Sequence, residues 1–168
     1  GTPIGSHFAP HNPDYVDLTA NAAFDPALAR DLLAQAGYAE GFSTTLKLPP
    51  PSYARRGGEI IAAQLREVGI EAEISFLEWA QWLEQVFRGY DYGLTIVSHT
   101  EPMDINIYAR PDYYFQYDNP DFQALIETLS VESDPAARSD LLAQAQTMIA
   151  EDFVNGYLFQ LALTSVVD

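Results

Sequence analysis

Residues 44–76 read TTLKLPPPSYARRGGEIIAAQLREVGIEAEISF. The run 44–48 predicts a strand that stops at three prolines, and the alternation of apolar and polar residues over 72–76 predicts a half-exposed strand. Between them, residues 52–68 place apolar side chains on one side of a predicted helix. A helix that crosses between two strands is the unit of a parallel sheet, so this stretch predicts an α/β fold.

Further helices are predicted where a capping side chain precedes a proline, because proline suits the first helical position. Three pairs show this pattern: Asp25-Pro26, Asn119-Pro120 and Asp134-Pro135. A shorter helix is predicted over residues 79–87, with Glu78 as its cap and one of Trp79 and Trp82 packing the core.

The continuous apolar runs 94–97 and 158–163 predict strands that are buried on both faces. The predicted fold class is therefore α/β, with a mixed sheet flanked by helices. Residues 1–24 carry several prolines and no periodicity, so we expect an extended segment leading into a lobe over 25–168. One continuous core is expected from five residues along the chain: Leu32, Leu65, Ile96, Ile149 and Leu161.

Composition excludes several classes of function. The 168 residues hold 24 Asp and Glu against 8 Lys and Arg, a net charge of −16, which disfavours nucleic-acid partners and anionic membranes. The chain has no cysteine, which excludes disulfides and thiolate catalysis. No apolar run approaches the length of roughly 18 residues that membrane insertion requires. The acid excess suits an extracytoplasmic protein or a binder of cationic ligands.

Several motifs together resemble a known family. They are FDPALARDLLAQAGY at 24–38, IAAQL at 61–65 with VGI at 68–70, EW at 78–79 with GYD at 89–91, and AQAQ at 143–146 with IAED at 149–152. In this order they resemble the extracellular solute-binding proteins of the peptide/nickel type, family 5. These are the oligopeptide- and dipeptide-binding receptors of ABC importers. The resemblance covers nearly the whole chain.

The resemblance implies one lobe, the second, of a periplasmic-binding-protein-like class II fold, excised from a longer two-lobe chain. It implies a monomeric, non-enzymatic receptor without cofactor, located in the periplasm or tethered outside the cell, whose precursor carries a signal peptide. Its partners would be a peptide or another small polar ligand, captured by closure against the first lobe, and an ABC permease.

The predicted ligand site follows the strand 94–97, because α/β sheets bind ligands beyond the carboxyl ends of their strands. In the resembling family an aromatic residue and an acid at this position contact the ligand, and the acid pairs with the ammonium group of a peptide. His99 holds the place of the aromatic residue, and Glu101 and Asp104 are the available acids. The alternative is a solvated acidic loop.

The following loop is rich in aromatic residues, which offer large contact areas at low entropic cost. Tyr108, Tyr113 and Tyr114 are predicted as ligand contacts, with packing of the loop as the equal alternative. Phe115 and Tyr117 are predicted to pack.

Two other functions remain open from the residues alone. Glu101 and Asp104 could form the acid/base pair of a hydrolase, or the aromatic loop could bind another protein. His7, His11 and Asp14 resemble a metal site, but Pro10 prevents a helical pairing of the histidines, and no metal is predicted.

Overall fold

A computed structural model describes residues 1–101 and 103–162 of the chain. The chain divides into two compact units, the first made of residues 1–23 with those from Thr100 onward, and the second of Phe24–His99. Each unit has its own hydrophobic core.

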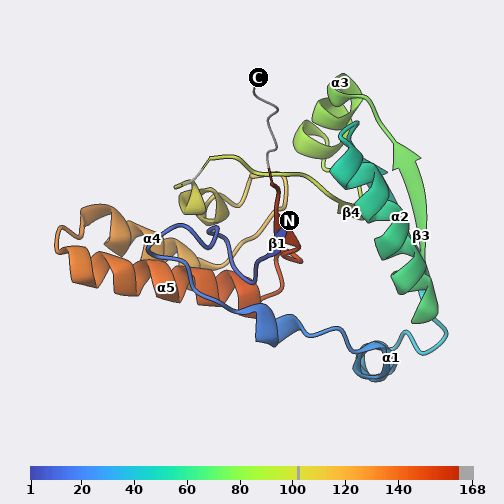
Figure 1. The fold of residues 1–168 in the computed structure, drawn as a ribbon, viewed down its shortest axis with the longest axis horizontal. Helices are drawn as coiled ribbons and strands as arrows, with labels where there is room; N and C mark the ends of the chain where they lie inside the picture. Colours follow the sequence, from blue (N-terminus) through green and yellow to red (C-terminus); the bar gives the residue numbers. More distant parts are fainter. Residues whose placement is uncertain (102, 163–168) are drawn as a thin grey trace, which may run out of the picture. The chain divides into compact units, whose positions relative to one another are not determined.

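The second unit contains a parallel three-stranded sheet in the order β3-β2-β4. Strand β2 (Phe42–Leu48) pairs in register with β3 (Ile70–Phe76) along its whole length, and with the two-residue β4 (Leu94–Thr95) at Leu46 and Lys47. Helix α2 (Ser52–Glu67) crosses from β2 to β3 and lies along the sheet (Figure 1). The predicted strand–helix–strand unit is confirmed.

Local caps set the helices of the second unit. The Asp25 carboxylate accepts the N–H groups of Ala27 and Leu28 at the start of α1 (Pro26–Gln35). Glu78 and Gln81 form a reciprocal capping box at α3 (Trp79–Trp82), which continues as the π-helical η2 (Leu83–Arg88). Trp82 is buried and Trp79 is exposed, so one of the two tryptophans packs the core, as predicted for the helix over residues 79–87.

The first unit is mainly helical. Asn119 caps α4 (Pro120–Val131) and Asp134 caps α5 (Pro135–Glu151), and the two helices lie side by side (Figure 1). The unit also contains two short 3₁₀ helices, η1 (Thr19–Ala22) and η3 (Ile105–Ala109). Among the described residues, its core cluster contains eight that are buried: Phe8, Ile105, Tyr108, Phe122, Leu129, Leu142, Ala145 and Ile149.

Residues 1–23 are not simply extended. Phe8 is part of the core, and the fully buried Ser6 places its hydroxyl 3.0 Å from Gln146 Oε1 on α5. The Gln146 amide in turn donates to the Asp14 carbonyl at 2.7 Å. Gln146 thus clamps this segment onto α5, because a buried amide must find hydrogen-bond partners.

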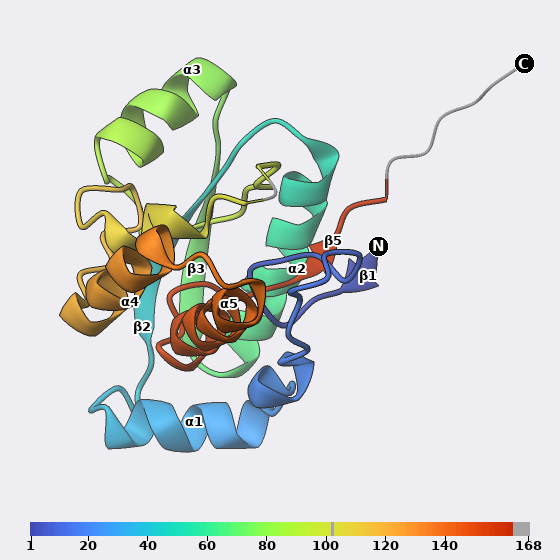
Figure 2. The same ribbon diagram turned by 90° about the vertical axis from the view of Figure 1, so that its left-hand side faces the viewer.

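The predicted burial of the two apolar runs is wrong. The last strand β5 (Phe159–Gln160) pairs antiparallel with β1 (Thr2–Pro3) in a separate ribbon, which Figure 2 shows, and Leu158, Phe159 and Leu161 are each 40–41% exposed. Leu94 in β4 is 40% exposed. Position 163, the end of the second predicted run, lies outside the described residues.

The predicted continuous core is also wrong. Leu65 and Ile96 pack on the core of the second unit, whereas Ile149 belongs to that of the first. Leu32 is 54% exposed on α1, which has no buried residue, and Leu161 follows the β1–β5 ribbon and is 41% exposed. The class is α/β, but parallel and antiparallel pairings occupy two separate sheets rather than one mixed sheet.

Candidate functional site

The predicted ligand residues fall into different units. His99 is exposed and ends the second unit, whereas Glu101, Asp104 and the three tyrosines belong to the first. Most of the candidate site residues therefore lie in the first unit.

The two acids differ in environment. Glu101 is exposed, and its carboxylate accepts the neighbouring Thr100 N–H at 3.2 Å. Asp104 precedes η3, and its Oδ1 lies 2.9 Å from Nε2 of His7. The side chains of His7 and Asp104 are only 6% and 15% exposed. Because a carboxylate only accepts hydrogen bonds, Nε2 of His7 carries the hydrogen.

The three tyrosines divide by burial. Tyr108 belongs to the core and stacks on Phe115, with the ring centroids 4.5 Å apart. Tyr114 is also buried. Tyr113 is half-buried, and the Arg110 guanidinium lies over its ring, 5.0 Å from the centroid. Of the three rings, that of Tyr113 is therefore the most accessible to a ligand.

Electrostatics connect Tyr113 with both acids. Partial burial raises the pKa of the Tyr113 hydroxyl, and the negative charges of Asp104 and Glu101 raise the pKa further, whereas Arg110 opposes them. The hydroxyl is therefore neutral at pH 7 and lies in the field of two carboxylates. Such surroundings favour a ligand cation or a hydrogen-bond donor over an anion.

Phe115 and Tyr117 pack as predicted. Phe115 is packed against the core of the first unit, and its ring also contacts that of Tyr113 at a centroid distance of 4.9 Å. The Tyr117 ring packs edge-on against Phe122, and its hydroxyl donates to the Asp152 carboxylate.

The contact of His7 with Asp104 was not predicted from the sequence. The sequence associates His7 with His11 and Asp14, but the structure gives the three separate partners. His11 accepts from the Gln160 amide at 3.0 Å, and Asp14 accepts from the Ser139 hydroxyl at 2.6 Å. His7 and Asp104 lie 97 positions apart, so no local pattern could have paired them.

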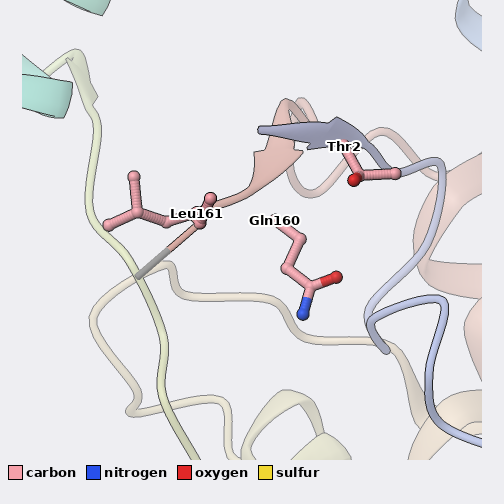
Figure 3. A pocket seen from close by; sticks show the side chains of 4 residues that line it. Thr2, Gln160 and Leu161 are labelled. Carbon is pink, nitrogen blue, oxygen red and sulfur yellow. The ribbon is translucent and has the colours of Figure 1, made fainter. Parts of the chain in front are cut away.

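An open hollow lies elsewhere in the first unit, beside the β1–β5 ribbon. Figure 3 shows Thr2, Gln160 and Leu161 at its edge, and Ala162 also lines it. None of the predicted ligand residues lines this hollow. Among the described residues, no helix combines the length and apolar content that a membrane span requires.

Curated relatives resemble this chain over most of its length. The Di/tripeptide-binding protein 3 of Pseudomonas aeruginosa is 28% identical over 151 residues, which are 82% of this chain and 28% of that protein. The dipeptide-binding protein of Escherichia coli is 36% identical over 84 residues, 47% of this chain and 15% of that protein.

Solved structures share the fold. A dipeptide-binding protein from Pseudoalteromonas in complex with Met-Leu matches with a TM-score of 0.80 at 23% identity, over 92% of this chain and 33% of that one. The oligopeptide-binding protein AppA from Bacillus subtilis, in complex with a nonapeptide, matches with a TM-score of 0.81 at 21% identity, over 95% and 36%. This chain spans at most 36% of the length of any of these four relatives.

The family described as bacterial extracellular solute-binding proteins, family 5, middle part, matches residues 1–117. The match includes all of the second unit and, in the first, His7, both acids and the three tyrosines. The chain belongs to the family 5 bacterial extracellular solute-binding proteins.

Proposed function

We propose that this chain forms part of the ligand-binding region of an extracytoplasmic receptor for peptides or another small polar solute. The observation that carries the proposal is the family match over residues 1–117. Relatives named for di- and tripeptide binding and fold neighbours solved with peptides support a peptide ligand.

Within the chain, we assign the ligand contacts to the accessible atoms of Tyr113 and of the two acids near it, Glu101 and Asp104. Glu101 and Asp104 supply negative charge near the half-buried ring of Tyr113. A peptide ammonium group suits this environment, because hydrogen bonds to charged groups contribute roughly 1.5–3 kcal/mol each. Tyr108 and Tyr114 shape the site from beneath, since both are buried. His99 is exposed at the end of the second unit and remains a predicted ligand contact of that unit.

The receptor works by closing its first lobe, which lies outside this chain, over the ligand. Closure removes the ligand from water, and small-molecule sites bury most of the surface of their ligands. In this proposal the closed receptor is a monomer in the periplasm, or tethered outside the cell, and delivers its ligand to an ABC permease. It performs no chemistry on the ligand.

Calorimetry on the natural polypeptide that contains this chain tests the proposal, with Met-Leu, a nonapeptide and free leucine as probes. Binding of at least one peptide, recovered intact by mass spectrometry, is the expected result. Hydrolysis of the probes would favour a hydrolase using Glu101 and Asp104. A protein partner bound in the absence of any solute binding would favour the aromatic loop as an interaction module.

A further inference from the structure

His7 is held firmly on both sides along the chain. Ser6 is fully buried and lies within hydrogen-bond distance of the Val16 carbonyl and of Gln146, while Phe8 is part of the core. The imidazole also meets the Tyr108 ring edge-on, at a centroid distance of 5.3 Å. A side chain fixed in this way can position another group, because its own movement is restricted by packing.

Asp104 differs from the other polar residues that begin helices in this chain. Asp25, Asn119 and Asp134 each accept backbone N–H groups of their own helices. Asp104 occupies the corresponding place before η3 and makes no such bond, and its Oδ1 is turned to His7. The hydrogen bond with His7, which lies in residues 1–23, therefore takes the place of a local cap.

We propose that His7 is a positioning residue that orients the Asp104 carboxylate toward the ammonium group of a bound peptide. The inference rests on the proposed function. The bond from Nε2 fixes the plane of a carboxylate that is largely buried yet close enough to Tyr113 to act on its hydroxyl. A carboxylate held in one orientation gives a directional contact, whereas a rotating one does not.

The proposed role requires the imidazole at position 7, and an imidazole elsewhere in the same segment would not fill it. His11 lies in the same segment, but it is exposed and bonds to Gln160. It provides a matched control, because its replacement removes an imidazole from the segment without touching Asp104.

The test compares two probes on the natural polypeptide: Met-Leu and N-acetyl-Met-Leu, which lacks the ammonium group. The wild-type protein should prefer Met-Leu by about tenfold to a hundredfold, the range expected for a charged hydrogen bond. His7→Leu keeps apolar volume against Phe8 and Tyr108 but removes the donor, and this preference should fall to less than about threefold. His7→Gln retains an N–H donor and should restore part of the preference, while His11→Leu should leave it unchanged.

The ratio of the two affinities separates positioning from folding. A general loss of structure would weaken the binding of both probes by the same factor and leave the ratio of their affinities unaltered. An unaltered ratio in His7→Leu would overturn the proposal. The nitrogen resonance of His7 Nε2 in the wild-type protein gives a second measurement that needs no variant. It should shift on binding Met-Leu and stay in place on binding N-acetyl-Met-Leu.

An unchanged preference in His7→Leu, or equal shifts with both probes, would refute the role of His7 and leave the proposed function standing. Absence of peptide binding in the wild-type protein would refute the proposed function and this inference with it.

Discussion

Gly58 on α2 lies directly against the side chain of Leu48 at the end of β2. A Cβ atom at position 58 would stand 2.2 Å from Cδ1 of Leu48, closer than any real contact. Leu48 is fully buried in the core of the second unit, and its Cδ2 and Cγ atoms would also lie 3.0 and 3.2 Å from that Cβ. The helix approaches the strand this closely because position 58 has no side chain.

Gly58→Ala should therefore destabilise the protein, although alanine favours helices. Overpacking of a filled core costs about 1–3 kcal/mol. The adjacent Gly57 provides the control, because a Cβ there meets only Ile96 Cδ1 at an ordinary 3.8 Å. Gly57→Ala should stabilise the helix by about 0.5–1 kcal/mol. Denaturant unfolding of both variants measures the difference, and equal effects would contradict the close contact.

The division into two cores gives a second prediction. Ile149 is fully buried in the core of the first unit, so Ile149→Ala should cost about 2–5 kcal/mol through the cavity that it leaves. Leu161 is exposed beside the ribbon, and Leu161→Ala should change stability by no more than about 0.5 kcal/mol. Thermal unfolding distinguishes them. A large loss in Leu161→Ala would restore the single core expected from the sequence.

Local chemistry explains which parts of this fold the sequence predicts. Asp25, Asn119 and Asp134 cap the helices that follow them, because a cap needs only the next two or three N–H groups. The pairing of β1 with β5 joins the two ends of the described chain, and no pattern in either strand specifies it. An apolar run fits a buried strand or an exposed ribbon equally well, so the burial of the run at 158–163 could not be predicted.

The same reason applies to the candidate site. The position of Glu101 and Asp104 after a strand follows from the order of elements. The contact of Asp104 with His7 depends on how distant segments meet. The burial of Tyr108 likewise involves Phe122 of α4, whose ring it meets edge-on. The aromatic run itself does not show which of its rings are buried.

Alkaline pH should destabilise the first unit through Tyr157. Burial raises the pKa of the Tyr157 hydroxyl from 10.0 to about 12. The folded state thus favours the neutral phenol, and this contribution is complete below pH 10 and lost as the pH rises toward 12. Two pH units correspond to roughly 2–3 kcal/mol. Chemical unfolding between pH 9 and pH 12 measures the loss, and Tyr157→Phe should reduce it. An identical loss in that variant would assign it to other tyrosines.

The acids of the candidate site should affect binding more than folding. In the natural polypeptide, Asp104→Asn and Glu101→Gln should each weaken Met-Leu binding by about tenfold to a hundredfold, because each removes a negative charge near the ammonium group. Glu127→Gln, on the exposed side of α4, is the control. Calorimetry gives the affinities. If both acids prove neutral while Tyr113→Ala abolishes binding, the site is aromatic and not acidic.

The side chain of Asn119 both caps the start of α4 and bonds to Asp152 at the end of α5. Its side-chain oxygen accepts the N–H groups of Asp121 and Phe122, while its amide nitrogen donates to Asp152 Oδ2 at 2.9 Å. Aspartate caps helices as well as asparagine does, so Asn119→Asp keeps the cap. It also sets a second carboxylate against Asp152, and two unit charges 4 Å apart repel by about 1 kcal/mol even in water.

Asn119→Asp should therefore destabilise the protein at pH 7 by at least this amount. Salt screens the repulsion between exposed carboxylates, so the difference from wild type should shrink at about 1 M NaCl. Asp25→Asn is the matched control, because Asp25 caps the exposed α1 by the same two backbone bonds and its exchange should be nearly neutral. Urea unfolding at pH 7, in low salt and at about 1 M NaCl, gives both differences. A loss in Asn119→Asp that is equally large at both salt concentrations would mean that the amide matters for its hydrogen bonds and shape and not for its lack of charge.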